Sequence, residues 1–291
     1  MIYVYRRASS SGARELVDAL MEAGLPSKRW SDKWKRTPKA GDRILCWGEG
    51  LDRADLTILN GAPVVSKLTD ALKLASENIS TIEVSRARPE NRPVDVVGPA
   101  HRAALDAAQE FAEHQGVPLR EAVVEARDYF TRLIEALDAP AAPVSVWLGR
   151  KSNHVGGMDL LNPPDRPDYW VKQVKLVEEY RLHIFQGKSI RAGIKVPREG
   201  FSGPGQPPAH AWVRSYEGGW RIRYDDFKSS KKMRELAAGA VKALNLDFGA
   251  VDLGKREDGN LMVLEVNRAP GLEGGTVEAY VEAIQKWVRG E

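Results

Sequence analysis

The stretch VDLGKREDGNLMVLEVN, residues 251–267, places two acids and an amide within otherwise apolar, strand-like runs. The Asp-Gly pair between the two runs is a strong hairpin signal, which predicts a loop of two or four residues centred there. Regular pairing outward from that loop sets Asp252 directly opposite Glu265. Asn267 lies two residues beyond Glu265 and therefore shares its face of the sheet.

This face of the predicted hairpin carries like charges, which repel when they lie directly opposite each other. The hairpin offers no basic partner on that face, because Lys255 belongs to the apolar side. The apolar side is expected to be core and comprises Val251, Leu253, Leu264 and Val266. Two carboxylates and an amide oxygen are hard ligands suited to Mg²⁺. The alternative is an ordinary solvated hairpin face, but the opposed acids favour a metal.

The composition is that of a globular chain long enough for two or more packed units, with 291 residues, 43% hydrophobic and 29% charged. A net charge of +3 fits an anionic small-molecule ligand and is too weak to indicate nucleic-acid binding. The single cysteine, Cys46, excludes an internal disulfide and predicts a reducing compartment. Without a membrane-length apolar run or a signal-peptide pattern, we expect a cytoplasmic protein with no membrane partner.

Four regions follow from the pattern along the chain, which predicts an α+β or α/β fold. Residues 1–88 alternate short apolar runs with amphipathic helices, as in a small parallel α/β domain. APVVS and STIEVS are read as two of its strands. Residues 89–143 hold two Ala-rich helices, interpreted as an insertion packed on the body, with a lid or docking role as the alternative. Residues 144–200 and 201–291 are expected to form two β-rich subdomains.

The segment WLGRKSNHVGGMDL is predicted to be a strand, a polar loop and a return. Gly156 and Gly157 would let backbone amides approach phosphate oxygens, and Arg150 or Lys151 would supply positive charge. Since any tight hairpin can carry two glycines, this loop alone is weak evidence of phosphate binding.

The chain as a whole resembles the ATP-grasp superfamily, and within it the carboxylate–amine ligases of the ribosomal-protein glutamate-ligase type and related phage-encoded enzymes. The best match is LDFGAVDLGKREDGNLMVLEVNRAPGLEG, which is similar to the family's metal-binding Asp strand, its Glu-x-Asn strand and its Pro-Gly turn. The resemblance implies an ATP-grasp fold behind a small N-terminal domain. It makes Asp252, Glu265 and Asn267 the ligands of Mg²⁺, with Mn²⁺ as the alternative ion, and ATP the nucleotide.

The segment VKQVKLVEEYRLHIFQGKSIRAGIKV resembles the family's hinge and the strands that follow it. By this resemblance Glu179 faces the ribose and Arg181 the phosphates or the acyl intermediate. The two share a strand face, as these roles require, although they would also do so in a surface ion pair of little energetic value. Three hinge residues would border the adenine through backbone groups, namely Lys172, Gln173 and Val174.

Further basic residues match the family with less distinctive context. Lys195 and Arg214 stand where it places contacts to the substrate or the γ-phosphate. Lys67 matches a phosphate-contacting lysine that precedes a helix, with Lys73 as the alternative. Arg150 replaces the lysine that usually precedes the glycine loop, and its planar fork would grip phosphate differently from a point charge.

The activity implied by the resemblance is an ATP-dependent carboxylate–amine ligase that forms an amide through an acyl phosphate. The alternatives are an ATP-grasp kinase that phosphorylates a small molecule and a non-catalytic nucleotide-binding protein. The carboxylate and amine substrates remain open among amino acids, a peptide and a protein terminus, and no nucleic-acid partner is expected.

Overall fold

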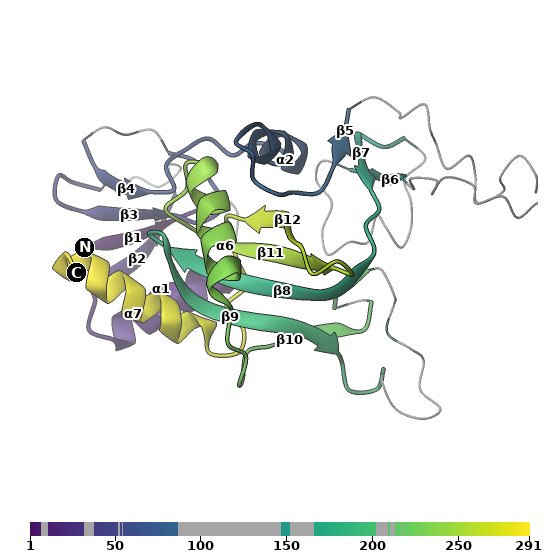
Figure 1. Cartoon of the computed structure of the whole chain (residues 1–291). Helices are drawn as coiled ribbons and strands as arrows, with labels where there is room; N and C mark the ends of the chain where they lie inside the picture. Colours follow the sequence, from purple (N-terminus) through teal and green to yellow (C-terminus); the bar gives the residue numbers. More distant parts are fainter. Residues whose placement is uncertain are drawn as a thin grey trace, which may run out of the picture.

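The computed structural model describes residues 1–6, 11–31, 38–51, 53, 55–86, 147–151, 166–201, 209, 213–216 and 218–291. The helical insertion predicted over residues 89–143 and the pair Gly156 and Gly157 lie outside this set. The described chain forms three sheets and four helices, arranged as in Figure 1. None of these helices combines the length and apolar character needed to cross a membrane.

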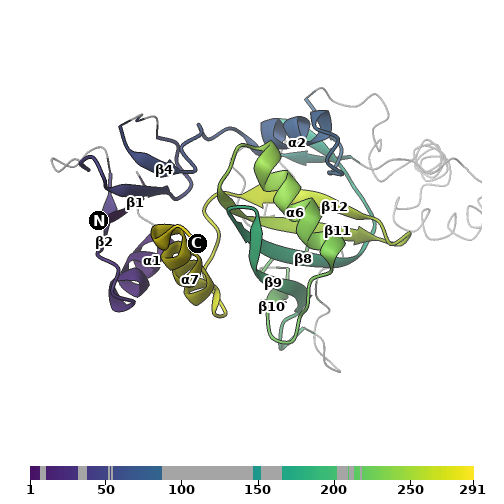
Figure 2. The same ribbon diagram turned by 60° about the vertical axis from the view of Figure 1, so that its left-hand side comes forward.

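The N-terminal sheet is entirely parallel, with strand order β2-β1-β3-β4. Its strands are β1 (Ile2–Tyr5), β2 (Ser27–Trp30), β3 (Arg43–Cys46) and β4 (Thr57–Leu59). Helix α1 (Ser11–Glu22) buries its apolar stripe, including Leu16 and Leu20. The terminal helix α7 (Thr276–Arg289) lies beside α1 (Figure 2). The strands are thus parallel as expected, and a helix from the other end of the chain packs beside α1.

The central sheet has the order β10-β9-β8-β11-β12 and is antiparallel throughout. Its strands are β8 (Leu176–Phe185), β9 (Lys188–Pro197), β10 (Trp220–Arg223), β11 (Phe248–Arg256) and β12 (Leu261–Asn267). Helix α6 (Lys231–Ala243) covers one face (Figure 1). Tyr180, Leu182 and Ile184 alternate along β8 and are buried toward α6. The intervening residues of β8 point to the opposite face.

The third sheet has the order β5-β7-β6 and is antiparallel. It consists of β5 (Val84–Ser85), β6 (Trp147–Arg150) and β7 (Tyr169–Lys172). The expectation that STIEVS supplies a parallel strand to the N-terminal unit is wrong, because its strand β5 pairs antiparallel with β7. APVVS is not a strand either, and its last residue, Ser66, is instead the N-cap of α2 (Lys67–Ser76). Helix α2 packs against β12, β5 and α6.

The hairpin of β11 and β12 pairs Asp252 with Glu265 as predicted, but its loop length and its register differ from those of the regular hairpin expected. The Arg256 amide donates to the Asn260 carbonyl at 2.9 Å, so the loop holds three residues rather than two or four. A bulge between Asp252 and Leu253 then restores the expected pairing. Leu264 is the extra residue, and a Cβ on Gly254 would lie 3.2 Å from its side chain.

The bulge explains how β12 serves both faces of the sheet. Val263 and Val266 are both buried against α6, although residues three positions apart point to opposite faces of a regular strand. A regular strand would have put Val263 and Glu265 on the same face. The expectation that Leu264 belongs to the core is wrong, because this side chain is half-buried and lies beside Gly254 on the face of Asp252.

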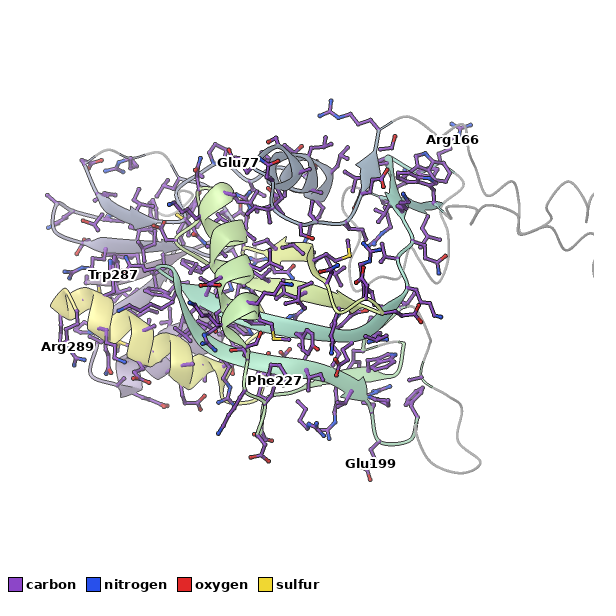
Figure 3. The ribbon with its side chains drawn as sticks, in the orientation of Figure 1. Glu77, Arg166, Glu199, Phe227, Trp287 and Arg289 are labelled. Atoms are coloured by element: carbon purple, nitrogen blue, oxygen red, sulfur yellow. The ribbon has the colours of Figure 1, made fainter. Side chains whose placement is uncertain are left out.

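A shared core joins the N-terminal unit to the central sheet. Trp47, which follows β3, stacks on Phe248 of β11 at 5.5 Å and meets the Tyr280 ring edge-on at 5.5 Å. Elsewhere, Arg43 lies 5.4 Å from the centre of the Trp287 ring and donates to the Val288 carbonyl at 3.2 Å, which fastens the end of α7 (Figure 3). Aromatic packing of this kind buries large apolar areas and fixes relative orientation.

Candidate functional site

One face of the central sheet, opposite α6, carries a group of charged and polar side chains that we call the charged face. Strand register alone places Arg181, Asp252 and Glu265 side by side on β8, β11 and β12. Gly193 of β9 continues the same row beyond Arg181. The charged face consists of Glu179, Arg181, Lys195, Asp252, Glu265 and Asn267.

The centre of the charged face is a two-pronged ion pair between Arg181 and Asp252. The Arg181 Nε lies 2.7 Å from Asp252 Oδ1, and its Nη2 lies 2.9 Å from Oδ2. Lys195 Nζ lies 3.7 Å from Asp252 Oδ2 and 2.9 Å from Glu179 Oε2. Burial by itself would raise the pKa of Asp252, but Arg181 and Lys195 outweigh it and hold that pKa well below its usual range.

The outer edge of the charged face is closed by Lys67, the first residue of α2. Its ammonium lies 2.9 Å from Glu265 Oε1 and 2.9 Å from Asn267 Oδ1. The hydroxyl of the N-cap Ser66 accepts from the Thr69 amide at 3.2 Å and so fixes where α2 begins. Burial tends to raise the pKa of Glu265, but Lys67 outweighs it and the pKa is lowered. Of the two candidate lysines, Lys67 therefore meets the charged face.

The expected repulsion between the two acids is offset from outside the hairpin. Arg181 and Lys195 come from neighbouring strands and Lys67 from a helix, so each carboxylate has a cationic partner. Both acids remain ionised, and ionised carboxylates are what a divalent cation requires.

The donor set of the charged face fits Mg²⁺. Within the described part of the chain, no group of three or more His, Cys, Asp or Glu side chains is arranged to hold a metal ion. The set is instead two carboxylates, Asp252 and Glu265, with the amide oxygen of Asn267 as the third hard donor. Lys67 and Arg181 contact these same oxygens.

Arg214 approaches the charged face from the segment before β10. Its Nη2 donates to the Leu176 carbonyl at 2.8 Å, and its guanidinium lies 4.7 Å from the centre of the Trp220 ring. Its Nε is 3.7 Å from Glu179 Oε1. Glu179 is therefore buried between Lys195 and Arg214. Arg214 thus also holds the beginning of β8 in place, in addition to the predicted contact with the substrate or the γ-phosphate.

The basic residues assigned to the hinge and the glycine loop do not join the charged face. Lys172 binds Glu83 at 2.8 Å and Lys151 binds Asp168 at 2.9 Å, in pairs whose side chains are partly exposed. Arg150 ends β6, opposite Tyr169. The remaining hinge residues, Gln173 and Val174, are half-buried between β7 and β8.

Two polar pairs near the charged face were missed from the sequence. Arg268 Nη2 lies 2.8 Å from Asp70 Oδ1 in an ion pair that is about nine-tenths buried. Burial raises the pKa of Asp70 even though Arg268 opposes that effect. His183 Nε2 lies 3.1 Å from the Tyr224 hydroxyl, and burial lowers the pKa of His183 to about 3. Arg268 follows Asn267 directly, and His183 shares the strand face of Arg181; either spacing could have drawn attention to them.

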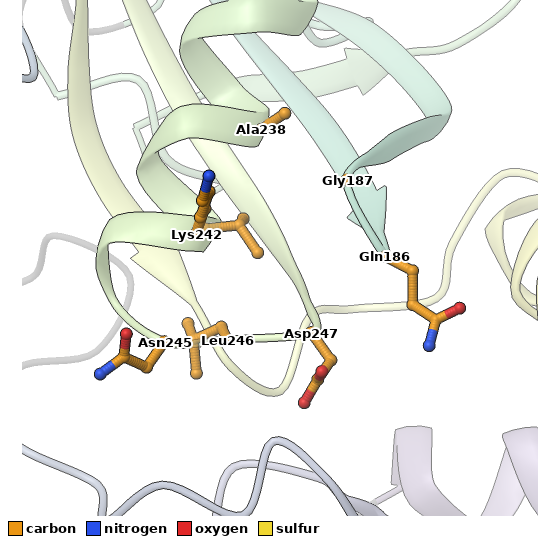
Figure 4. A pocket seen from close by; sticks show the side chains of 8 residues that line it. Gln186, Gly187, Ala238, Lys242, Asn245, Leu246 and Asp247 are labelled. Atoms are coloured by element: carbon orange, nitrogen blue, oxygen red, sulfur yellow. The ribbon is translucent and has the colours of Figure 1, made fainter.

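A separate hollow of about 540 Å³ lies at the end of α6, away from the charged face. Its lining includes Lys242 and Asp247, whose side chains point in different directions (Figure 4). Asp247 already accepts from the Asn60 amide at 2.6 Å. The hollow therefore lacks converging polar groups, and the charged face is the better candidate.

Comparison of the sequence with known proteins gives no match to a family model and none to a curated protein. Comparison of the structure does give matches. The ATP-grasp ligase PsnB, complexed with minimal precursor, Mg and ADP, is 11% identical with a TM-score of 0.54, over 98% of this chain and 96% of that one.

Two further solved structures match over nearly their whole length. The D-alanine–D-alanine ligase from Bacillus anthracis is 12% identical with a TM-score of 0.54, over 99% of this chain and 96% of that one. The macrocyclase MdnC from Microcystis aeruginosa MRC, bound with precursor peptide MdnA, is 10% identical with a TM-score of 0.51, over 100% of both chains. At such identities these likenesses establish a shared fold.

Proposed function

We propose, from the premise that this chain has the ATP-grasp fold, that it is an ATP-dependent carboxylate–amine ligase. The observation that carries the proposal is the row of Arg181, Asp252 and Glu265 closed by Lys67, where opposite charges meet on one sheet face. Such a row offers oxygen ligands to a cation and cationic groups to phosphate within one site.

The nucleotide is proposed to lie along the charged face. Its triphosphate would meet Lys67, Arg181 and Lys195, with Arg214 at the margin. Its ribose would meet Glu179. Its base would lie near the hinge, where Leu176 and Leu264 flank Gly254 and a Cβ on that glycine would come within 2.8 Å of Leu176. A surface that is apolar there and charged further along the sheet suits a nucleotide, which is apolar at one end and anionic at the other.

Asp252, Glu265 and Asn267 are proposed to hold Mg²⁺. The chemistry supplied by an ion held there would be neutralisation of the phosphate charge. The contribution of the chain itself is to keep both carboxylates ionised, through Lys67, Arg181 and Lys195, and to hold the donors at fixed places on two paired strands.

The proposed reaction has two displacements. An oxygen of the substrate carboxylate attacks the γ-phosphorus, and the bond to the β-phosphate oxygen breaks, which releases ADP and forms an acyl phosphate. The amine nitrogen then attacks the acyl carbon, loses a proton, and expels inorganic phosphate to leave an amide. Arg181 and Lys195 would stabilise the charge on the transferring group. The reaction requires no protein nucleophile, and Cys46 is unsuited to that role because burial raises the pKa of its thiol to about 12.

The substrates are proposed to be amino acids or peptides. PsnB and MdnC were solved with precursor peptides, and the third structure is a D-alanine–D-alanine ligase. The charged face supplies several cations, which favours an anionic carboxylate donor.

Product analysis tests the proposal against its two rivals. The protein is incubated with Mg-ATP and paired amino acids or short peptides, and phosphate release and product mass are recorded. A ligase gives ADP, phosphate and a product lighter than its two parts by one water. A kinase gives ADP and a phosphoester without free phosphate. Binding of Mg-ATP with no turnover on any pair would favour a non-catalytic protein.

A further inference from the structure

The segment that leads into α2 is fastened to the end of β12 by a single arginine. Arg268 donates through Nη2 to Asp70 Oδ1 at 2.8 Å and through Nη1 to the Pro63 carbonyl at 3.1 Å. Pro63 precedes the N-cap of α2, and Asp70 lies in its first turn. The two prongs of one guanidinium therefore hold α2 on both sides of Lys67.

Within the described residues, Lys67 is the only residue of α2 that contacts a carboxylate of the charged face. Both of its contacts are with side chains of β12. Its ammonium bonds Glu265 and Asn267, and Arg268 is the next residue after Asn267. The two bridges run in opposite directions: a lysine of α2 reaches β12, and the arginine that directly follows β12 reaches α2. A shift or rotation of α2 would have to break both.

Stability alone is a weak reason for the pair of Arg268 and Asp70. Its side chains are 10% and 8% exposed, and the desolvation of a buried ion pair can exceed its Coulombic gain. The Nε of Arg268 is also buried and has no hydrogen-bond partner among the described residues. What the pair supplies beyond an apolar contact is a fixed direction, because a guanidinium that bonds two acceptors defines a plane.

We propose that Arg268 and Asp70 are positioning residues for Lys67: they fix the first turn of α2 so that the lysine ammonium is held at Glu265 and Asn267, ready to contact the phosphates of the nucleotide. This inference rests on the proposed function and assigns to two further residues a part in nucleotide binding without contact to the nucleotide.

The test measures binding of the Mg²⁺ complex of the non-hydrolysable analogue AMPPNP by isothermal titration calorimetry. Four proteins form a cycle: wild type, Lys67→Met, the pair variant Asp70→Leu/Arg268→Met, and the triple variant. The pair variant replaces both charges with apolar groups, so that no buried charge is left unpaired. Arg43→Met is the matched control, because Arg43 also tethers a helix, α7, but far from the charged face.

We expect Lys67→Met and the pair variant each to weaken binding by about tenfold, with a melting temperature close to that of the wild type. The triple variant should be no more than about twofold weaker than Lys67→Met, because both changes remove the same interaction. Arg43→Met should bind as the wild type does.

Two outcomes overturn the inference alone: a pair variant that binds within about twofold of the wild type, or a triple variant in which the two losses multiply to about a hundredfold. A wild type that binds no Mg-AMPPNP overturns the proposed function and this inference with it. If the pair variant does not fold, Arg268→Lys decides, because one ammonium cannot reproduce the planar fork. Binding about threefold weaker at unchanged melting temperature supports the inference, and unchanged binding contradicts it.

Discussion

The five-stranded and three-stranded sheets both carry basic side chains that the sequence assigns to a nucleotide, and they hold them in different ways. In the central sheet, Arg181 on β8 and Lys195 on β9 are mostly buried and face Asp252 on β11. In the small sheet, Lys172 and Lys151 form exposed pairs with acids. Burial turns an ion pair into a constraint on geometry, whereas an exposed pair contributes about 0–1 kcal/mol.

The comparison separates two kinds of charge by what happens when one partner is removed. A buried carboxylate that loses its cation is left desolvated and uncompensated, which costs about 3–5 kcal/mol. An exposed carboxylate that loses its cation is rehydrated. Charges of the first kind are expensive to keep, so their convergence on one sheet face needs a reason, and a site for a cation and a polyphosphate supplies one.

The largest expected effect concerns the bulge that lets β12 serve both faces of the central sheet. Val263 and Leu264 are neighbours at this bulge, but only Val263 is fully buried against α6. Val263→Asp would place an unpaired carboxylate in that core, and we expect a loss of at least about 4 kcal/mol of stability, enough to abolish the folded state. Chemical denaturation followed by circular dichroism measures it.

Leu264→Ala is the matched control at the neighbouring position, because it changes the residue on the other face of the bulge and leaves Val263 in place. We expect it to lose only about 1 kcal/mol, since this side chain is half-buried. A Val263→Asp variant as stable as Leu264→Ala would show that the bulge does not hold Val263 in the core.

Asp252→Asn should have the largest effect on activity. Removing one charged ligand of the proposed metal should lower kcat for ADP formation by about 10²–10³-fold. Relief of repulsion between the two acids would predict a more stable protein, but the structure pairs Asp252 with Arg181 and Lys195, so we expect destabilisation. Coupled-enzyme detection of ADP and thermal denaturation test the two parts separately. Normal turnover by this variant would remove Asp252 from the metal site.

Acidification should remove the stability that the ionised carboxylates contribute, because the pKa values of Asp252 and Glu265 are lowered by folding. A carboxyl group with a depressed folded pKa contributes stability that is present above its unfolded pKa, about 4, and is lost as the pH falls through the folded value. The stability difference between wild type and Asp252→Asn should therefore shrink steadily below about pH 5. Urea unfolding between pH 7 and pH 3 measures it, and a difference that stays constant over this range would contradict the pairing.

Much of this arrangement was predictable from the sequence, and the limits have physical causes. The ATP-grasp fold that the resemblance implies is confirmed by the fold comparisons, and the pairing of Asp252 with Glu265 is confirmed by the register. That pairing was reached by assuming a regular hairpin. The three-residue loop and the bulge each shift the register by one residue, and the two shifts cancel. Alternation of side chains cannot reveal such a cancellation.

The packing partners of α2 could not be predicted from the sequence, for a different reason. An amphipathic stripe shows that a helix buries one face, but not against what. The stripe of α2 is covered by β5, which is close in sequence, and by β12 and α6, which come from the C-terminal part of the chain. The pair of Arg268 and Asp70 depends on this packing, so it stayed hidden although both residues adjoin predicted site residues.

The smallest expected effect belongs to the exposed pair of the small sheet. Lys172→Met should change the stability by no more than about 0.5 kcal/mol, because the ammonium pairs with Glu83 in solvent. The KM for ATP should also stay within about twofold, since the proposed role of Lys172 uses its backbone. Lys67→Met, which removes a lysine of similar reach from the charged face, should raise that KM by about tenfold. A comparable rise in Lys172→Met would mean that the small sheet brings its own cations to the phosphates, and contact with the charged face would then no longer tell which lysines belong to the site.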